Sequence, residues 1–292
     1  MRALLAALRI LRDVIIYRLR KREMANLAAS ASIMVAISLP WHSVAVRLVF
    51  GLVLNLFAYL TNDLYDVEAD EVCADRDSTK AAHLRTHRSA AIATLLVLFA
   101  LLLGIGLATS FGLAITALTC AGLCWAYSAR LKCVPILDVA TIAACGVAGS
   151  MLAFPLDRAA GWLLAMQLGL FAASFQTVQI VRDHDHDAVS GCRTTGVLLG
   201  ETRTIVLQRG LLVMSALYAT IALHTWIGTG MLGVACLRFP PKQASRHWNR
   251  IRLALGVAWL AIVTMVRVTG RTHGLLFSVD ASVVLEPLSG VR

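Results

Sequence analysis

The residues best suited to chemistry form a short polar stretch, "NDLYDVEAD", at residues 62–70. Asn62, Asp66 and Asp70 follow one another at intervals of four residues. On an α-helix this spacing places the three side chains along one face, over roughly 12 Å at 1.5 Å per residue. Asp63 lies about 100° away around such a helix, where it would support a ligand rather than act as one. The stretch therefore predicts a row of oxygen ligands.

A second acidic stretch, "RDHDHDAVSG", begins at Arg182, and its Asp183 and Asp187 repeat the four-residue interval. Carboxylates this close together repel, and near apolar walls some of them would take up protons. A hard cation removes the repulsion, and Mg²⁺ takes carboxylates together with phosphate oxygens. Two such rows facing each other would hold a diphosphate through bridging Mg²⁺, which would draw charge from this leaving group.

Solvated loop acids are the other interpretation of either stretch taken alone. Two acidic stretches at equivalent positions favour a cation-binding site, because loops on the inner side of a membrane normally carry Lys and Arg rather than Asp. His184 and His186, within the second stretch, are expected to be exposed loop residues and not ligands.

Basic and phenolic side chains near the two stretches are candidates for binding the phosphate groups. Lys80 follows the first stretch and Arg193 follows the second, while Tyr127 and Lys132 belong to "WAYSARLK" between them. These residues would reach one diphosphate if the segments that carry them surround a single cavity. Taken singly, each basic residue is better explained as a topology signal at the inner membrane face.

The elements that must position these residues are membrane-spanning helices. The 292-residue chain is 58% hydrophobic and 15% charged, with a mean hydropathy of +0.73, whereas soluble domains are about half apolar and about a quarter charged. Apolar stretches of sufficient length predict about nine spans, of which the eighth is short enough to be re-entrant or strongly tilted. The spans are 24–40, 43–62, 89–109, 111–128, 134–155, 160–181, 204–224, 226–237 and 251–269. The predicted fold class is all-α, a polytopic bundle of membrane helices.

Charge placement predicts the orientation of this integral, multi-pass bundle. With the N-terminus inside, most of the 27 Lys and Arg residues fall in the inner segments, as the positive-inside rule expects. Both acidic stretches then lie at the cytoplasmic face. The net charge of +10 needs no nucleic-acid partner, and the bilayer is the expected one. We expect a basic amphipathic surface helix at 1–23, a transmembrane domain at 24–270 and a C-terminal tail at 271–292.

The chain has seven Cys residues and no Cys-x-x-Cys pair. Most of them lie in apolar spans, where Cys behaves as a small packing residue. We therefore expect the cysteines to stay reduced.

The acidic stretches resemble the motifs of the UbiA superfamily of intramembrane prenyltransferases. "NDLYDVEAD" matches the family's NDxxDxxxD, and "RDHDHDAVSGCRTTGVLLG" is similar to its RDxxxDxxxG pattern followed by Arg, Thr and a terminal Leu-Gly. "AYSARLK" resembles the family's Tyr-Ser…Lys segment. The order, the spacing and the predicted helices fit, so the resemblance covers approximately 24–270.

The resemblance implies a UbiA-like helical bundle whose cavity opens sideways to lipid. It implies a Mg²⁺-dependent transfer of an isoprenoid chain from a polyprenyl diphosphate to a lipophilic, aromatic acceptor. Ionisation would give an allylic carbocation, which an apolar, aromatic interior would shield from water. In such proteins Mg²⁺ and diphosphate would be bound by Asn62, Asp66, Asp70, Asp183 and Asp187, and the four aspartates would be catalytic.

One departure from the family pattern leaves a second activity open. Many members continue the first motif with Arg-Pro and then a Gly, whereas this chain reads "EVCADRDSTKAAHLRTHRS". The superfamily includes terpene cyclases, in which the cation is captured within its own chain, so a membrane terpene cyclase is the alternative. A divalent-cation carrier is a third interpretation, although carrier sites usually lie near the bilayer midplane and both acidic stretches lie at span ends.

Overall fold

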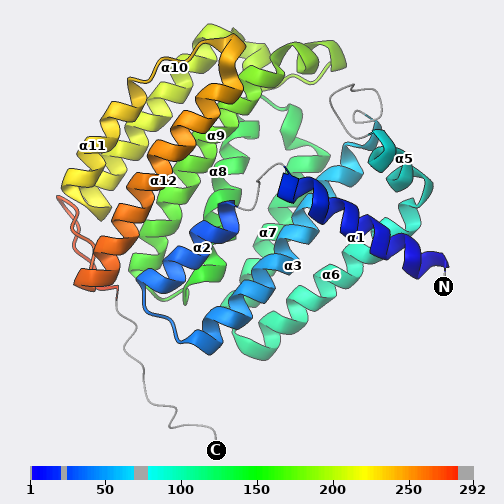
Figure 1. Cartoon of the computed structure of the whole chain (residues 1–292), viewed down its shortest axis with the longest axis horizontal. Coiled ribbons are helices and arrows are strands. Elements are labelled where there is room, and N and C mark those ends of the chain that lie inside the picture. Colours follow the sequence, from blue (N-terminus) through cyan, green and yellow to red (C-terminus); the bar gives the residue numbers. More distant parts are fainter. Residues whose placement is uncertain (1, 21–24, 69–77, 282–292) are drawn as a thin grey trace, which may run out of the picture.

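The computed structural model describes residues 2–20, 25–68 and 78–281, which form eleven α-helices (Figure 1). Within these residues the only β-structure consists of two isolated bridges, His224–His273 and Arg271–Asp280. The predicted all-α class is therefore confirmed.

Six helices in the described part of the chain are long and apolar enough to cross a membrane. They are α3 (Trp41–Tyr65), α6 (Arg88–Thr109), α7 (Phe111–Ala129), α9 (Ala159–Ser190), α10 (Thr195–Tyr218, continued by Ala219–Leu223) and α12 (Ala244–Thr269). Shorter apolar helices occupy the other predicted spans, namely α2 (Ala25–Ala36), α8 (Leu137–Ser150, continued by Met151–Ala153) and α11 (Thr225–Ala235). Each predicted span thus overlaps a helix, but nine complete crossings are not confirmed.

The outer faces of the long helices carry large apolar side chains. Leu96, Val97 and Leu107 of α6 are exposed, and so are Leu253 and Leu260 of α12. Contiguous apolar surface of this kind is unfavourable in water, whereas lipid tails solvate it without cost. The structure is that of an integral, multi-pass membrane protein.

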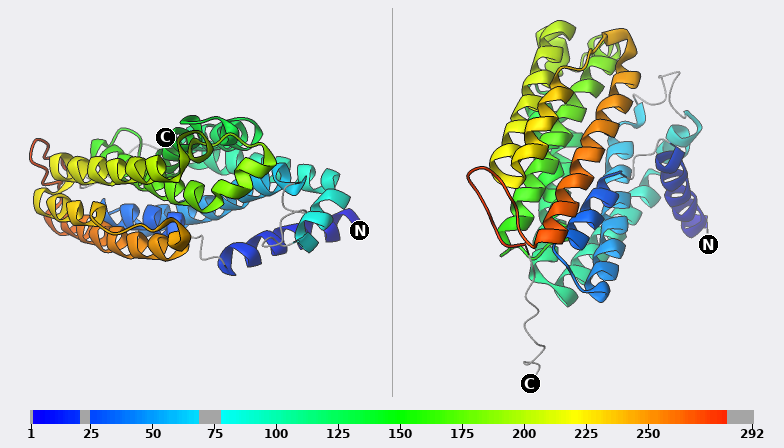
Figure 2. Two further views of the ribbon diagram at one scale, coloured as in Figure 1. Left: turned by 90° about the horizontal axis from the view of Figure 1, so that it is seen from above. Right: turned by 60° about the vertical axis from the view of Figure 1, so that its left-hand side comes forward.

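Two further helices, α1 (Arg2–Arg20) and α5 (Ser78–Thr86), lie beside the bundle and contact each other (Figures 1 and 2). Ile10 of α1 is buried in one cluster with Leu60 of α3, while apolar side chains such as Leu4 remain exposed. One apolar face of α1 is thus docked while other apolar side chains are exposed; a location at the membrane surface stays a prediction for this segment.

The packing order of the helices brings the polar ends together. The helix α3 packs on α7, α7 packs on α8, and α9 packs against both α8 and α10. The residues that follow α3, α7 and α9 consequently meet at one end of the bundle, as the contacts described below show.

Two helix boundaries differ from the predictions. Helix α3 ends at Tyr65 and Asp66 caps it, so one regular helix does not carry the whole first row; Asp70 lies outside the described residues. Helix α9 continues to Ser190, where Gly191 (φ +75°) ends it in the left-handed conformation that favours glycine. His184 and His186 therefore lie on a helix and not in a loop.

Candidate active site

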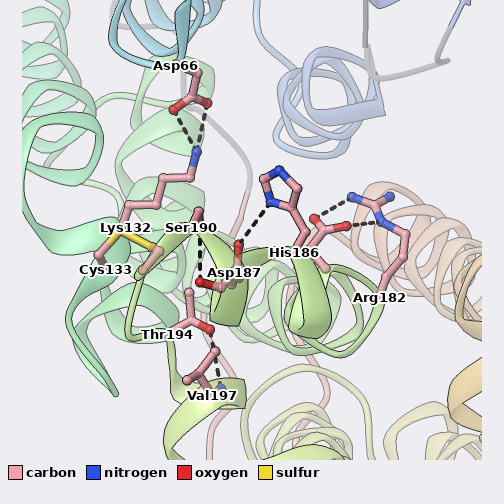
Figure 3. A network of polar contacts seen from close by, with 11 residues as sticks. Asp66, Lys132, Cys133, Arg182, His186, Asp187, Ser190, Thr194 and Val197 are labelled. Carbon is pink, nitrogen blue, oxygen red and sulfur yellow. Dashed lines mark hydrogen bonds and ion pairs between the residues drawn. A yellow bond between two sulfur atoms is a disulfide. The ribbon is translucent and has the colours of Figure 1, made fainter. Parts of the chain in front are cut away.

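Asp66 is held at the end of α3 by two neighbours. Its carboxylate accepts a hydrogen bond from the side-chain amide of Asn62 at 3.0 Å and lies 2.7 Å, through each oxygen, from the ammonium group of Lys132 (Figure 3). Asp66 is buried, whereas the Lys132 side chain is 32% exposed. Asn62 and Asp66 therefore point toward one place, as their spacing predicted.

Asp187 lies on the part of α9 beyond the predicted span 160–181, close to Lys132 in Figure 3. Burial raises the pKa of Asp187 and the carboxylate of Asp183 raises it further, whereas a hydrogen bond from Thr194 and the positive charge of Lys132 lower it. The net result is a raised pKa, so the surroundings of Asp187 disfavour its ionised form. A divalent cation relieves that condition.

Lys132 therefore links the two acidic stretches. It lies in the short turn Leu131–Cys133 after α7, pairs directly with Asp66 and is close enough to Asp187 to act on its ionisation. Segments that are distant in sequence thus converge, which is the arrangement that the sequence analysis required. The catalytic and ligand roles of these residues stay predictions.

The loops after α7 and α9 are also joined covalently. Cys133 forms a disulfide with Cys192, with the two Cα atoms 4.8 Å apart (Figure 3, where Cys133 is labelled). The expectation that all the cysteines stay reduced is wrong for this pair. The two residues are 59 positions apart, so no local spacing signalled the bond, and only the folded chain brings them together.

We expect Cys133 and Cys192 to resist thiol alkylation until the protein is reduced. Cys236 is a free and exposed cysteine, so it should react with a maleimide without any reductant and serves as the internal control. Alkylation before and after reduction, followed by peptide mass analysis, measures both. Labelling of Cys133 in the unreduced protein would contradict the disulfide.

Lys80 contacts a different carboxylate of the first acidic stretch. Its ammonium group forms a 2.7 Å ion pair with Asp63 and lies 4.3 Å from the centre of the Tyr17 ring. Lys80 and Asp63 are both buried. The ion pair joins α5 to α3, next to the end of the helix that carries Asp66; a contact between Lys80 and diphosphate stays a prediction.

The other predicted site residues occupy several environments. Asp183 forms two hydrogen bonds with the guanidinium group of Arg182, at 2.7 and 2.9 Å. The phenol oxygen of Tyr127 accepts a hydrogen bond from Gln176 at 3.1 Å, so Tyr127 is turned toward α9. Arg193 is exposed and directly follows the disulfide-bonded Cys192. A role for Asp183, Tyr127 or Arg193 in binding diphosphate stays a prediction.

Comparison with known proteins agrees with the resemblance seen in the two acidic motifs. The sequence model of the UbiA prenyltransferase family matches residues 24–254. A search of curated proteins found no match.

Several solved structures share the fold. A UbiA homologue from Archaeoglobus fulgidus bound to GPP and Mg²⁺ has a TM-score of 0.62 at 17% identity, over 90% of this chain and 99% of that one. A UbiA homologue from the same organism bound to DMAPP and Mg²⁺ has a TM-score of 0.63 at 16% identity, over 90% and 99%. A structure described in connection with digeranylgeranylglyceryl phosphate synthase in membranes has a TM-score of 0.60 at 12% identity, over 91% and 99%.

Proposed function

This chain belongs to the UbiA prenyltransferase family, and from that membership we propose that it is a Mg²⁺-dependent prenyltransferase. It would move an isoprenoid chain from a polyprenyl diphosphate to a lipophilic acceptor and release diphosphate. The observation that carries the proposal is the convergence of the three segments that carry Asp66, Lys132 and Asp187, which the Asp66–Lys132 ion pair and the Cys133–Cys192 disulfide join. The similar structures that hold GPP or DMAPP with Mg²⁺ support it.

The donor atoms at the site fit Mg²⁺. Asn62, Asp66, Asp183 and Asp187 offer oxygen ligands, which this hard cation prefers. The buried Asp66 already holds a positive group, the Lys132 ammonium, so the site favours cations. When bound there, Mg²⁺ would make the diphosphate a better leaving group.

The chain's own basic groups would hold the diphosphate. Lys132 is positioned at the meeting point of the acidic stretches and carries three donors for phosphate oxygens. Arg193 is exposed on the adjacent loop and offers a planar fork that suits phosphate. On this proposal Lys132 exchanges its contact with Asp66 for the diphosphate as substrate binds.

Two aromatic pairs pack within the helical bundle. The Phe171 ring lies 6.3 Å from that of Trp259, and the Phe175 ring lies 4.7 Å from that of Trp248. Both phenylalanines lie on α9, the helix that also carries Asp187. Such walls would exclude water and stabilise an allylic cation through their ring faces. The positive-inside pattern supports placing the site at the cytoplasmic face.

Diphosphate release by the purified protein tests the proposal. The protein in lipid nanodiscs would be given labelled geranyl, farnesyl or geranylgeranyl diphosphate, with Mg²⁺ or with a chelator. We expect Mg²⁺-dependent release of diphosphate with at least one chain length when acceptor lipids are present. Absence of release with every chain length would count against the proposal.

Product analysis distinguishes the transferase from a terpene cyclase. The missing Arg-Pro after the first motif is the observation that keeps the cyclase as a second candidate. Mass analysis of the lipid extract should show a prenylated acceptor if the enzyme is a transferase. A hydrocarbon or terpene alcohol formed without any acceptor would instead favour cyclisation. The carboxylates lie at helix ends and not at mid-helix, which favours either enzyme over a cation carrier.

A further inference from the structure

Asp138, at the start of α8, is a fully buried carboxylate whose oxygens are occupied by hydrogen bonds. One oxygen accepts from the backbone N–H of Thr195 at 2.7 Å, and the other accepts from the backbone N–H of Val139 at 2.8 Å. The hydroxyl of Thr195 donates to Asp138 as well. Its exposed fraction is 0%, so water does not compete for these bonds.

Two helix N-termini stabilise this buried charge. Val139 belongs to the first turn of α8, and Thr195 is the first residue of α10. Backbone N–H groups at such positions lack partners within the helix and carry a partial positive charge. Asp138 therefore fixes the start of α8 against the start of α10, and losing these bonds would leave a buried acceptor unsatisfied.

Close packing keeps the beginning of α10 in place. Gly196 follows Thr195 directly, and a side-chain carbon at this position would overlap the side chain of Ile180 and lie 3.2 Å from the Ile180 carbonyl oxygen. Only glycine allows this approach of α10 to α9. The start of α10 is thus a rigid support for whatever is bonded to Thr195.

The same threonine holds a strained backbone near the site. Ile136 has φ +72°, a conformation that a β-branched residue rarely adopts. Its N–H donates to the hydroxyl oxygen of Thr195 at 2.6 Å. Such a conformation persists only where the surrounding structure holds it, and Ile136 lies in the same short connection as Lys132.

We propose that Asp138 and Thr195 form a clamp that positions Lys132 for binding the diphosphate. The inference rests on the proposed function, because the diphosphate is part of it. The connection that carries Lys132 is fixed by α7 at one end and by the Cys133–Cys192 disulfide next to Lys132, and the clamp fixes its other end at Ile136. Without the clamp the ammonium group would sample more positions, so fewer molecules would hold it between Asp66 and Asp187. Asp138 and Thr195 are positioning residues and touch no substrate.

Thr195→Val tests the clamp, since valine keeps the shape and the backbone N–H but removes the hydroxyl. We expect the KM for prenyl diphosphate at saturating Mg²⁺ to rise about tenfold, as for a lost hydrogen bond to a charged group. Thr195→Ser keeps the hydroxyl and should restore the KM to within about twofold of the original.

Thr204→Val is the matched control. Thr204 lies on the same helix, is 0% exposed, and its hydroxyl donates within α10 to the carbonyl oxygen of Gly200 at 2.9 Å.

Combination with Lys132→Met separates positioning from general structural damage. If the clamp acts through Lys132, Thr195→Val should produce no further rise in KM in the Lys132→Met background. A full tenfold effect in both backgrounds would overturn the proposal, because it would show that the clamp acts independently of Lys132.

Two further measurements test the clamp without depending on enzyme activity. Hydrogen exchange of the peptide covering 130–138 should become faster in Thr195→Val and stay unchanged in Thr204→Val. Equilibrium binding of inorganic diphosphate with Mg²⁺ should weaken about tenfold in the first variant only. A chain that never releases diphosphate would end the proposed function, yet the exchange measurement would still decide on the clamp. Unchanged exchange in Thr195→Val would overturn the clamp, whatever the activity.

Discussion

Asp66→Asn is expected to lower Mg²⁺-dependent diphosphate release by about a thousandfold, because a charge aimed at the reacting groups is lost. Asparagine keeps the shape of the side chain, but it removes the negative charge that pairs with Lys132 at 2.7 Å. The same charge is needed to attract a divalent cation. Steady-state release of labelled diphosphate, measured over a range of Mg²⁺ concentrations, gives the loss as a change in kcat/KM.

The control for Asp66→Asn is Asp157→Asn. Asp157 precedes α9, has a 74% exposed side chain and lies beside Arg158. An exposed pair of this kind contributes little, so its loss should leave both the activity and the thermal unfolding midpoint unchanged. Elution as a single species in detergent would show that the Asp66 variant is folded. If that folded variant kept more than about a tenth of the activity, Asp66 would have no role in binding the cation.

Asp187→Asn is expected to lower the release by about a hundredfold. Asp187 belongs to the second acidic stretch, and burial and the Asp183 carboxylate raise its pKa while Lys132 lowers it. Removing its charge would leave Asp183 as the only proposed cation ligand in the second stretch. Competition between Mg²⁺ and a chelator in the activity assay should show that the variant requires a higher Mg²⁺ concentration.

Asp185→Asn provides a closely matched control on the same helix. The Asp185 side chain is 97% exposed and contacts His184 at 3.0 Å. Both substitutions change the net charge of this region equally. Loss of activity with Asp187→Asn but not with Asp185→Asn would assign the effect to the position of the carboxylate. Equal losses would mean that the region acts only through its overall charge.

The losses of activity caused by substituting Asp66 and Asp187 should not be independent of each other. If they hold the same cation and the same diphosphate, removing the second after the first should cost far less than the product of the single effects. Independent effects that multiply would point to two separate sites, and the shared centre would then be ruled out.

The sequence by itself determined where the helices lie and which end of them carries the acids. Hydropathy is a local property, so the apolar runs placed α3, α6 and α7 close to their observed limits. The four-residue interval brought Asn62 and Asp66 together, because neighbours at that spacing share a helix face. The eighth span, α11, was predicted to be short, but chain length and composition did not reveal that α2 and α8 are too short for six-turn crossings, since packing decides where a helix ends.

Only the tertiary structure decided which polar groups meet. Lys132 and Asp66 are 66 residues apart, Cys133 and Cys192 are 59 apart, and Asp138 and Thr195 are 57 apart. No periodicity within one segment encodes such pairs, because they depend on how α3, α7, α8, α9 and α10 pack together. Lys80 and Asp63 are another such pair, 17 residues apart; the contact between Lys80 and diphosphate stays a prediction. A buried charge takes whichever partner the folded chain brings within reach, since leaving it unpaired away from water is unfavourable.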